Sequence, residues 1–159
     1  MPRIHEKAIT VGHESIDMLG HVNNREYLRW MEEVALEHTA LQGWPTERYL
    51  ADGHAWVAAS HFIEFLRPAF AGERLVLHTW VESLAGACSI RRYAVMRERK
   101  LLARGETSWT FVNLAAGRAI PIPPPVAAAF ELVPASDPEL VVRGLARPPR
   151  RTARSSQPD

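Results

Sequence analysis

The spacing of apolar residues changes along this chain, and the change separates one long helix from a series of strands. No glycine or proline occurs from Asn24 to Gln42, and apolar side chains recur there every three or four positions. Gly43 and Pro45 follow directly and predict the end of the helix. The helix is expected to bury one broad face, formed by Tyr27, Leu28, Met31, Val34, Ala35, His38 and Leu41.

Elsewhere apolar residues alternate with a period of two, which is typical of half-buried strands. The runs rich in β-branched and aromatic residues are 3–11, 56–66, 73–84, 87–98 and 101–114. The last four runs are joined by short breaks, and short connections favour antiparallel neighbours. The sequence therefore predicts an α+β fold, in which one antiparallel sheet of about five strands wraps around one long central helix.

The end of the chain has a different composition. The prolines at 121 and 123–125 exclude a helix interior or a central strand, and residues 126–132 predict a short apolar helix. Beyond Pro134 the chain is rich in proline, arginine and serine and has no apolar periodicity, so we expect disorder there. The predicted organisation is one domain over 1–134 and a disordered Arg/Pro-rich tail over 135–159, dispensable for activity.

The overall composition is that of an ordinary globular protein and excludes several classes. With 159 residues, of which 47% are hydrophobic and 23% charged, one domain with a real core is expected. The net charge of +1 argues against a general nucleic-acid binder. The single cysteine, Cys88, excludes an internal disulfide and fits a reducing compartment. The N-terminal residues do not form a signal peptide, and no apolar run approaches the ~18 residues of a membrane span, so we expect a cytoplasmic location.

The loop before the helix carries the most informative chemistry. Asp17 begins the segment Asp-Met-Leu-Gly-His-Val-Asn-Asn, which ends at Asn24 where the helix starts. The free N–H groups and the dipole of a helix N-terminus favour negative charge. A carbonyl held there would meet Asp17 as base or nucleophile on one side and oxyanion donors on the other. This arrangement suits acyl chemistry, for which we expect no cofactor.

The same residues also have simpler roles. Asp17 is a natural turn former, and Asn23 and Asn24 are natural helix caps. His21 either supports the loop or takes part in proton transfer. Substrate contacts are expected from Gly20, Asn23 and Tyr27.

Other catalytic devices are weak or missing in the sequence. There is no Gly-x-Ser-x-Gly motif, and the seven histidines lack a paired metal-ligand spacing, so no metal site is predicted. Arg91 and Arg92 belong to a basic stretch that continues with Arg97, Arg99 and Lys100. This stretch is either a solvated hairpin or a phosphate-binding surface, because phosphates suit bidentate arginines.

Three segments together resemble the 4-hydroxybenzoyl-CoA thioesterase-like family of hotdog-fold acyl-CoA thioesterases. The first is Asp-x-x-Gly-His-Val-Asn-Asn-x-x-Tyr-Leu-x-Trp-x-Glu from Asp17, and the others are 61–73 and 103–112. Gly117-Arg118 followed by Pro-Ile-Pro is similar to the family's usual ending, so the resemblance covers roughly residues 3–133. The family's loop commonly carries Asp-x-Asp; here Ser15 replaces the first aspartate and Asp17 keeps the second.

The resemblance implies a hotdog fold and a catalytic Asp17, with a backbone N–H near Asn24 that binds the oxyanion. It also implies a homodimer or homotetramer with sites between subunits, acting on acyl-CoA or on an acyl carrier protein. Two alternatives stay open: a hotdog hydratase or dehydratase that pairs Asp17 with His21, and a non-catalytic acyl-CoA-binding protein.

Overall fold

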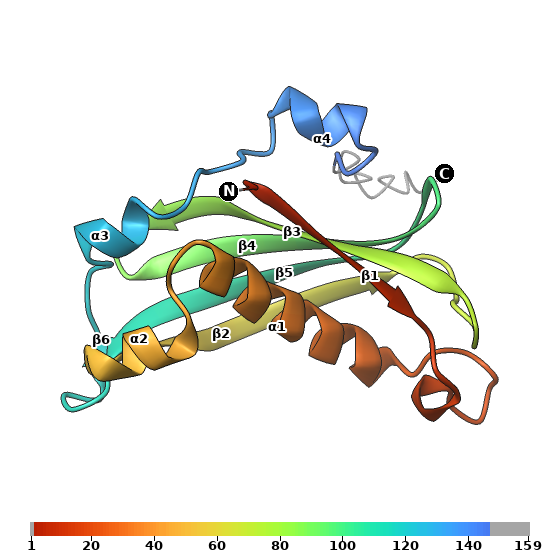
Figure 1. Cartoon of the computed structure of the whole chain (residues 1–159), viewed down its shortest axis with the longest axis horizontal. Coiled ribbons are helices and arrows are strands. Elements are labelled where there is room, and N and C mark those ends of the chain that lie inside the picture. The colour runs from red at the N-terminus through yellow and green to blue at the C-terminus, as the bar shows by residue number, and fades with distance from the viewer. Residues whose placement is uncertain (1, 147–159) are drawn as a thin grey trace, which may run out of the picture.

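The protein is a curled antiparallel sheet with one long helix lying along one face (Figure 1). The computed structural model describes residues 2–146. The predicted order of a strand, a long helix and four further strands is confirmed. The elements are β1 (Ile4–Thr10), η1 (His13–Ser15), α1 (Asn24–Leu41), α2 (Thr46–Ala51), β2 (His54–Phe65), β3 (Arg74–Ala85), β4 (Cys88–Arg97), β5 (Lys100–Asn113), β6 (Arg118–Ala119), α3 (Pro124–Ala127) and α4 (Pro138–Val142).

The strand order differs from the prediction at one point. The order across the sheet is β1-β3-β4-β5-β2, with β6 paired to the end of β5. Thus β2 does not pair with β3, the next strand along the chain; it pairs with β5, for example Ile63 with Gly105. The free side of β3 is taken by β1, where Lys7 opposes Leu77, so β2 is placed at the opposite edge. Both β1 and β2 are therefore edge strands.

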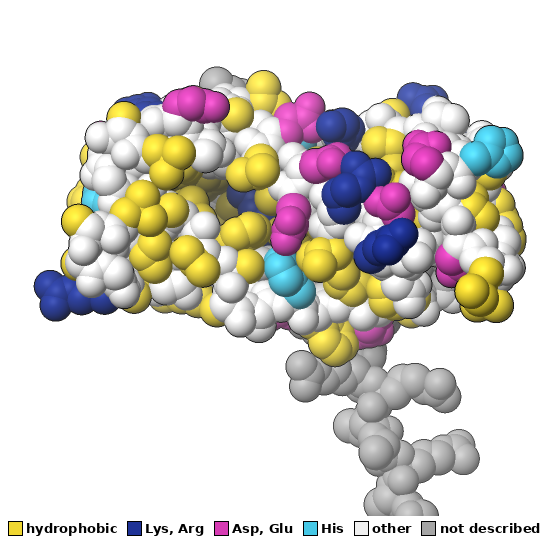
Figure 2. All heavy atoms as spheres, turned by 90° about the horizontal axis from the view of Figure 1, so that it is seen from below, with side chains coloured by type: hydrophobic (Ala, Val, Ile, Leu, Met, Phe, Trp, Pro, Cys, Tyr) yellow, Lys and Arg dark blue, Asp and Glu magenta, His cyan; other side chains and the backbone are white. Residues whose placement is uncertain are grey.

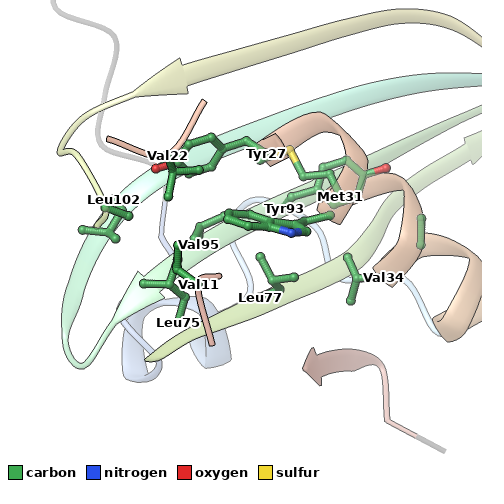
Figure 3. Packing of buried hydrophobic residues seen from close by; sticks show 14 residues of the cluster. Val11, Val22, Tyr27, Met31, Val34, Leu75, Leu77, Tyr93, Val95 and Leu102 are labelled. Carbon is green, nitrogen blue, oxygen red and sulfur yellow. The ribbon is translucent and has the colours of Figure 1, made fainter. Parts of the chain in front are cut away.

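The core lies between α1 and the inner face of the sheet. Figure 3 shows Tyr27, Met31 and Val34 of α1 directed toward side chains of the sheet, and all three are buried. A close approach near Gly105 depends on its missing side chain, because a Cβ there would lie 2.7 Å from Sδ of Met31. The predicted helical stripe is therefore confirmed for Tyr27, Met31, Val34, Ala35 and His38. Leu28 is only partly buried and Leu41 is 44% exposed, because the last turn of the helix extends past the sheet residues that it would contact. The sheet residues of this cluster include Leu75, Leu77, Tyr93, Val95 and Leu102.

The outer face of the sheet is covered by part of the segment that we expected to be disordered. Residues 135–146 form α4 and its flanks, and Leu140 and Leu145 are only 3% and 5% exposed. They pack with Ala94 and Met96, which alternate along β4 with the residues that face α1. The prediction of disorder is thus wrong for 135–146. Two apolar side chains are enough to hold this short segment in place, because the sheet already presents a partly apolar outer face to them. The rest of the predicted tail, 147–159, lies outside the described residues.

A third cluster closes one end of the molecule and contains α2, which the sequence did not predict. Six residues are too few to show helical periodicity, and the preceding Gly43 and Pro45 had indicated only a break. The predicted helix over 126–132 is shorter than expected, because α3 ends at Ala127. The cluster contains Trp44, Tyr49, Val81, Phe111, Val126 and Phe130. Within the described residues, none of the helices has the length and apolar character needed to cross a membrane.

Candidate active site

Asp17 lies at one end of a tight turn that is closed by backbone hydrogen bonds. Ile16 and Val22 form an antiparallel bridge, and the N–H of Asp17 donates to the carbonyl of His21 at 2.8 Å. The N–H of Gly20 donates back to the carbonyl of Asp17 at 3.1 Å, and Gly20 has a φ of +83°, which favours glycine. The turn therefore fixes the backbone of Asp17, and it requires a glycine three residues later.

Two backbone hydrogen bonds just before the start of α1 hold the end of the turn in place. The N–H of Asn23 donates to the carbonyl of Ser15 at 2.8 Å, and that of Val22 donates to the carbonyl of Ala69 at 2.9 Å. Ser15, which stands where relatives carry the first aspartate, is buried. Its backbone, not a carboxylate, holds the loop in place here.

The carboxylate of Asp17 combines the two roles that the sequence offered. Its Oδ1 accepts a hydrogen bond from the N–H of Leu19 at 2.9 Å, which is the turn-forming role. Its Oδ2 has no hydrogen-bond donor among residues 2–146, and the side chain is only half-buried. One carboxylate oxygen thus orients the group while the other is free to meet a water molecule or a carbonyl carbon.

The N-terminus of α1 leaves one donor unused beside this loop. Asn23 is the N-cap, as predicted: its Oδ1 accepts from the N–H of Arg25 at 3.1 Å, and its carbonyl accepts from the N–H of Glu26. Asn24 is not a cap but the first helical residue. Its N–H has no acceptor among the described residues, and Asn24 is exposed. This N–H is an available oxyanion donor.

His21 and Tyr27 line an open pocket of about 260 Å³ at the same end of α1, together with Asn24, Phe65 and Arg67. The ring of His21 lies edge-on to Phe70, with ring centres 5.8 Å apart. Within 2–146, no hydrogen bond or ion pair joins the side chains of His21 and Asp17. Tyr27 is largely a core residue, and burial raises the pKa of its hydroxyl. The substrate contacts expected from Gly20, Asn23 and Tyr27 stay predictions.

Arg91 and Arg92 lie on opposite faces of β4 and are not a solvated hairpin. Arg92 is on the outer face and forms ion pairs with Glu82 and Glu106. Arg91 is on the inner face, 5% exposed, beneath α1. The expectation of a solvated surface is therefore wrong for Arg91, because alternation along a strand turns it into the core. Binding of coenzyme A phosphates by either residue stays a prediction, and for Arg92 it requires displacement of its two glutamates.

The comparison with protein families shows which superfamily the chain belongs to. The family model of the thioesterase-like superfamily matches residues 11–130, which include the Asp17 turn, α1 and four of the long strands. The chain belongs to the thioesterase-like superfamily. The predicted resemblance and the hotdog fold are thereby confirmed, and the chain is placed among thioester hydrolases at the level of the superfamily. No curated protein sequence matches the chain.

Several solved structures have a similar fold. A hypothetical protein TT1821 from Thermus thermophilus is 27% identical, with a TM-score of 0.73 over 79% of this chain and 95% of that one. A 1,4-dihydroxy-2-naphthoyl-CoA thioesterase from Synechocystis is 20% identical, with a TM-score of 0.73 over 79% of this chain and 94% of that one. An acyl-ACP thioesterase from Bacteroides thetaiotaomicron is 19% identical, with a TM-score of 0.71 over 74% of this chain and 49% of that one.

No group of three or more histidine, cysteine or carboxylate side chains that could hold a metal occurs in the part of the chain that the structure describes.

The sequence missed a second group of functional interest, which lies at the other end of α1. Nη1 of Arg91 donates to Nδ1 of His38 at 2.9 Å and to Oγ1 of Thr79 at 3.1 Å. Nε2 of His38 then carries the proton and donates to the carbonyl of Pro2 at 2.9 Å. Burial and the charge of Arg91 lower the pKa of His38 to about 4, so His38 is neutral at pH 7. The helical spacing had indicated His38 as a stripe residue but gave no sign of its partner on β4.

The neutral state of His38 predicts a loss of stability in mild acid. The folded protein protonates His38 only near pH 4, whereas the unfolded chain takes up that proton near the ordinary value of 6.5. The contribution of His38 to stability is thus present above pH 6.5 and is lost as the pH falls toward 4. Between pH 7 and pH 5 we expect this residue to lower the free energy of unfolding by about 2 kcal/mol.

Urea unfolding of the wild type and of His38→Gln at both pH values measures this effect. The variant is expected to lose about 2 kcal/mol less than the wild type between pH 7 and pH 5. Equal losses in the two proteins would show that His38 is not the titrating group.

Proposed function

We propose that this protein hydrolyses an acyl thioester of coenzyme A or of an acyl carrier protein at the Asp17 turn. The observation that carries the proposal is the pairing of two unused groups in one eight-residue segment: Oδ2 of Asp17 and the N–H of Asn24. A base or nucleophile and an oxyanion donor are the minimum equipment for acyl transfer to water.

The reaction balances by either of two routes. In the first, Asp17 takes a proton from water as the water oxygen bonds to the thioester carbon. In the second, Asp17 attacks the carbon itself, and water then cleaves the mixed anhydride. In both routes the C–S bond breaks, the thiolate takes up a proton, and no cofactor is required. The N–H of Asn24 stabilises the oxyanion, and loss of one such donor typically costs ~3 kcal/mol.

The two alternative functions have less support. A hydratase dyad needs Asp17 and His21 to act together, and no hydrogen bond or ion pair joins their side chains within the described residues. A non-catalytic binding protein has no need of a carboxylate with one free oxygen beside a free helix N–H.

A thiol-release assay tests the proposal. Purified protein is incubated with short, long, branched and aromatic acyl-CoAs, and free thiol is measured with a thiol reagent. We expect release from at least one class, without hydration of a matched enoyl-CoA. Hydration without thiol release would instead establish the hydratase, and binding without either reaction would establish the non-catalytic protein.

The proposal includes a homodimer, or a homotetramer built from it. β2 is an open edge strand, and edges of this kind are normally paired or covered. Large apolar side chains are exposed along β2 and on the Asp17 turn, where Met18 is 99% exposed. They are Val57, Phe62, Phe65, Met18 and Leu19. Pairing of β2 with β2 of a second copy would cover the edge and join the two sheets.

Light scattering at micromolar concentration is expected to give at least twice the mass of one chain, 17.9 kDa. On dilution, activity per chain should fall together with the dimer, since the resemblance implies a site between subunits. A stable monomer with full activity would exclude this part of the proposal.

A further inference from the structure

A cavity of about 130 Å³ lies between the C-terminal half of α1, α2 and the inner face of the sheet. Figure 2 shows a hollow among hydrophobic side chains on this side of the molecule, with a basic side chain visible in it. The lining is mostly aromatic or aliphatic and includes Ala35, Tyr49, Trp56, Leu84, Trp109 and Phe130. Among residues 2–146, Arg91 is the one lysine or arginine that lines it.

The charge of Arg91 is buried without a counter-ion. No carboxylate within residues 2–146 forms an ion pair with it, and its hydrogen bonds go to neutral His38 and Thr79. Both bonds use Nη1, so Nε and Nη2 have no acceptor among the described residues. The indole N–H of Trp109, another lining residue, is also buried without an acceptor there. The cavity wall therefore offers unused donors and a positive charge.

Such an arrangement is costly unless a ligand compensates it. A charge removed from water without a partner costs several kcal/mol, and apolar replacements of buried charges often stabilise proteins. Two arginines on the outer face of the sheet have counter-ions instead: Arg92 pairs with Glu82 and Glu106, and Arg104 pairs with Glu64 at 2.8 Å. The guanidinium fork of Arg91 matches a carboxylate, which would accept from both free nitrogens.

We propose that this cavity binds the acyl group of the substrate, and that Arg91 selects acyl groups with a second carboxylate at the end far from the thioester. This inference rests on the proposed thioesterase function. The volume of the cavity limits the size of the acyl group, because a cavity of ~150 Å³ lined by apolar side chains binds one benzene ring. The substrate class is therefore a thioester of a dicarboxylic acid with one ring or a chain of about six carbons.

The catalytic turn for this cavity comes from a second copy of the chain. Asn24 and Ala35, the first residue of α1 that lines the cavity, are eleven residues apart, and a rise of 1.5 Å per residue separates them by about 16 Å. A six-carbon acyl group cannot span that distance within one protomer. Across the β2 edge the distance shortens, because twofold pairing runs the two β2 strands antiparallel.

The two ends of β2 show why this pairing suits the reaction. His54, Ala55 and Trp56 at its start line the cavity. At its other end Phe65 packs on Tyr27 in the first turn of α1, with ring centres 5.2 Å apart. Antiparallel pairing near the middle of β2 therefore brings the first turn of α1, and the Asp17 turn before it, from one copy to the cavity of the other.

Matched substrate pairs test the inference. Thiol release is compared for adipoyl-CoA against hexanoyl-CoA, and for 4-carboxybenzoyl-CoA against 4-methylbenzoyl-CoA. The wild type is expected to prefer the acid in at least one pair by about 30-fold or more in kcat/KM, the lower end for a buried, hydrogen-bonded charge pair. Arg91→Met is expected to abolish this preference while its unfolding temperature stays equal to or above that of the wild type. Arg104→Met, which removes an outer-face arginine of the neighbouring strand, is the matched control and should keep the preference.

Arg91→Gln keeps hydrogen-bond donors for Thr79 and His38 without the charge, and it decides the result if Arg91→Met does not fold. A wild type that releases thiol but shows no preference for the acids would overturn this inference and leave the proposed function intact. If Arg91→Gln lowers kcat/KM equally for the acid and for its uncharged partner, Arg91 acts on the coenzyme A phosphates or on the fold, and the inference is also overturned.

If no acyl-CoA releases thiol, calorimetry with adipate and hexanoate separates the cases. If the wild type binds adipate and Arg91→Gln does not, the cavity assignment is supported although the proposed function has failed. If adipate and hexanoate bind equally, or neither binds, the cavity assignment is refuted.

Discussion

Replacement of Asp17 by asparagine is expected to lower kcat by at least about 100-fold with little change in KM, because general-base catalysis alone contributes about 10²–10⁴-fold. The side-chain oxygen of asparagine can still accept the hydrogen bond from the N–H of Leu19, so the turn is expected to persist. The amide cannot act as a base or an effective nucleophile. Steady-state thiol release, with circular dichroism to verify folding, measures the effect.

Two further variants interpret this result. Glu14→Gln makes the same change of charge at an exposed position of the preceding segment and should leave kcat within about twofold of the wild type, as expected for a charge outside the reaction. His21→Ala should cost less than Asp17→Asn if His21 only supports the loop, and as much if the two form a dyad. A folded Asp17→Asn protein within about threefold of the wild-type rate would remove Asp17 from the mechanism.

Truncation after Pro134 is expected to lower the free energy of unfolding by about 3 kcal/mol, because it exposes the apolar outer face that Leu140 and Leu145 cover. It also removes the two acids that bind Arg3: Asp137 at 2.8 Å and Glu139 at 2.8 Å. For a domain of this size the unfolding temperature should fall by roughly 6–12 °C. Truncation after Ala146 keeps these contacts and is the matched control; its unfolding temperature should stay close to that of the full chain.

Thiol release by the folded fraction of both truncations is expected to stay within about tenfold of the full chain, a difference of ~1.4 kcal/mol. The reason is position: α4 packs on the outer face with Ala94 and Met96, whereas α1 and the Asp17 turn lie on the inner side. A larger loss in the folded protein truncated after Ala146 would place residues 147–159 in the site. Equal unfolding temperatures for both truncations would contradict the role assigned to Leu140 and Leu145.

Most elements of this fold are predictable because each has a strong local signal. The helix from Asn24 needs only its apolar spacing, its Asn23 cap and the Gly43 end, and the structure places α1 within one residue of that prediction. The alternation of the long strands likewise fixed their bounds to within two residues. Short elements without a period, such as α2 and α4, could not be predicted, since four to six residues carry little pattern and are stabilised by the surface that they cover.

Part of the candidate site was also predictable from local signals in the sequence. The Asp17 turn, Gly20 and the N-cap Asn23 are adjacent in the chain, so their geometry follows from local hydrogen bonds. The N-cap decides which N–H group stays free. The side chain of Asn23 accepts from the N–H of Arg25 and leaves the N–H of Asn24 without an acceptor among the described residues.

The sequence by itself determined the long helix, the strands and the local chemistry of the Asp17 turn, since these depend on residues within a few positions of one another. Only the tertiary structure decided the edge position of β2, the cover over the outer face and the burial of Arg91. Each of these depends on partners distant in the chain: β1 occupies the side of β3, Leu140 reaches β4, and His38 on α1 meets Arg91 on β4. A strand's alternation places Arg91 and Arg92 on opposite faces, but it does not say which face is inside; the packing of α1 against the sheet determines that.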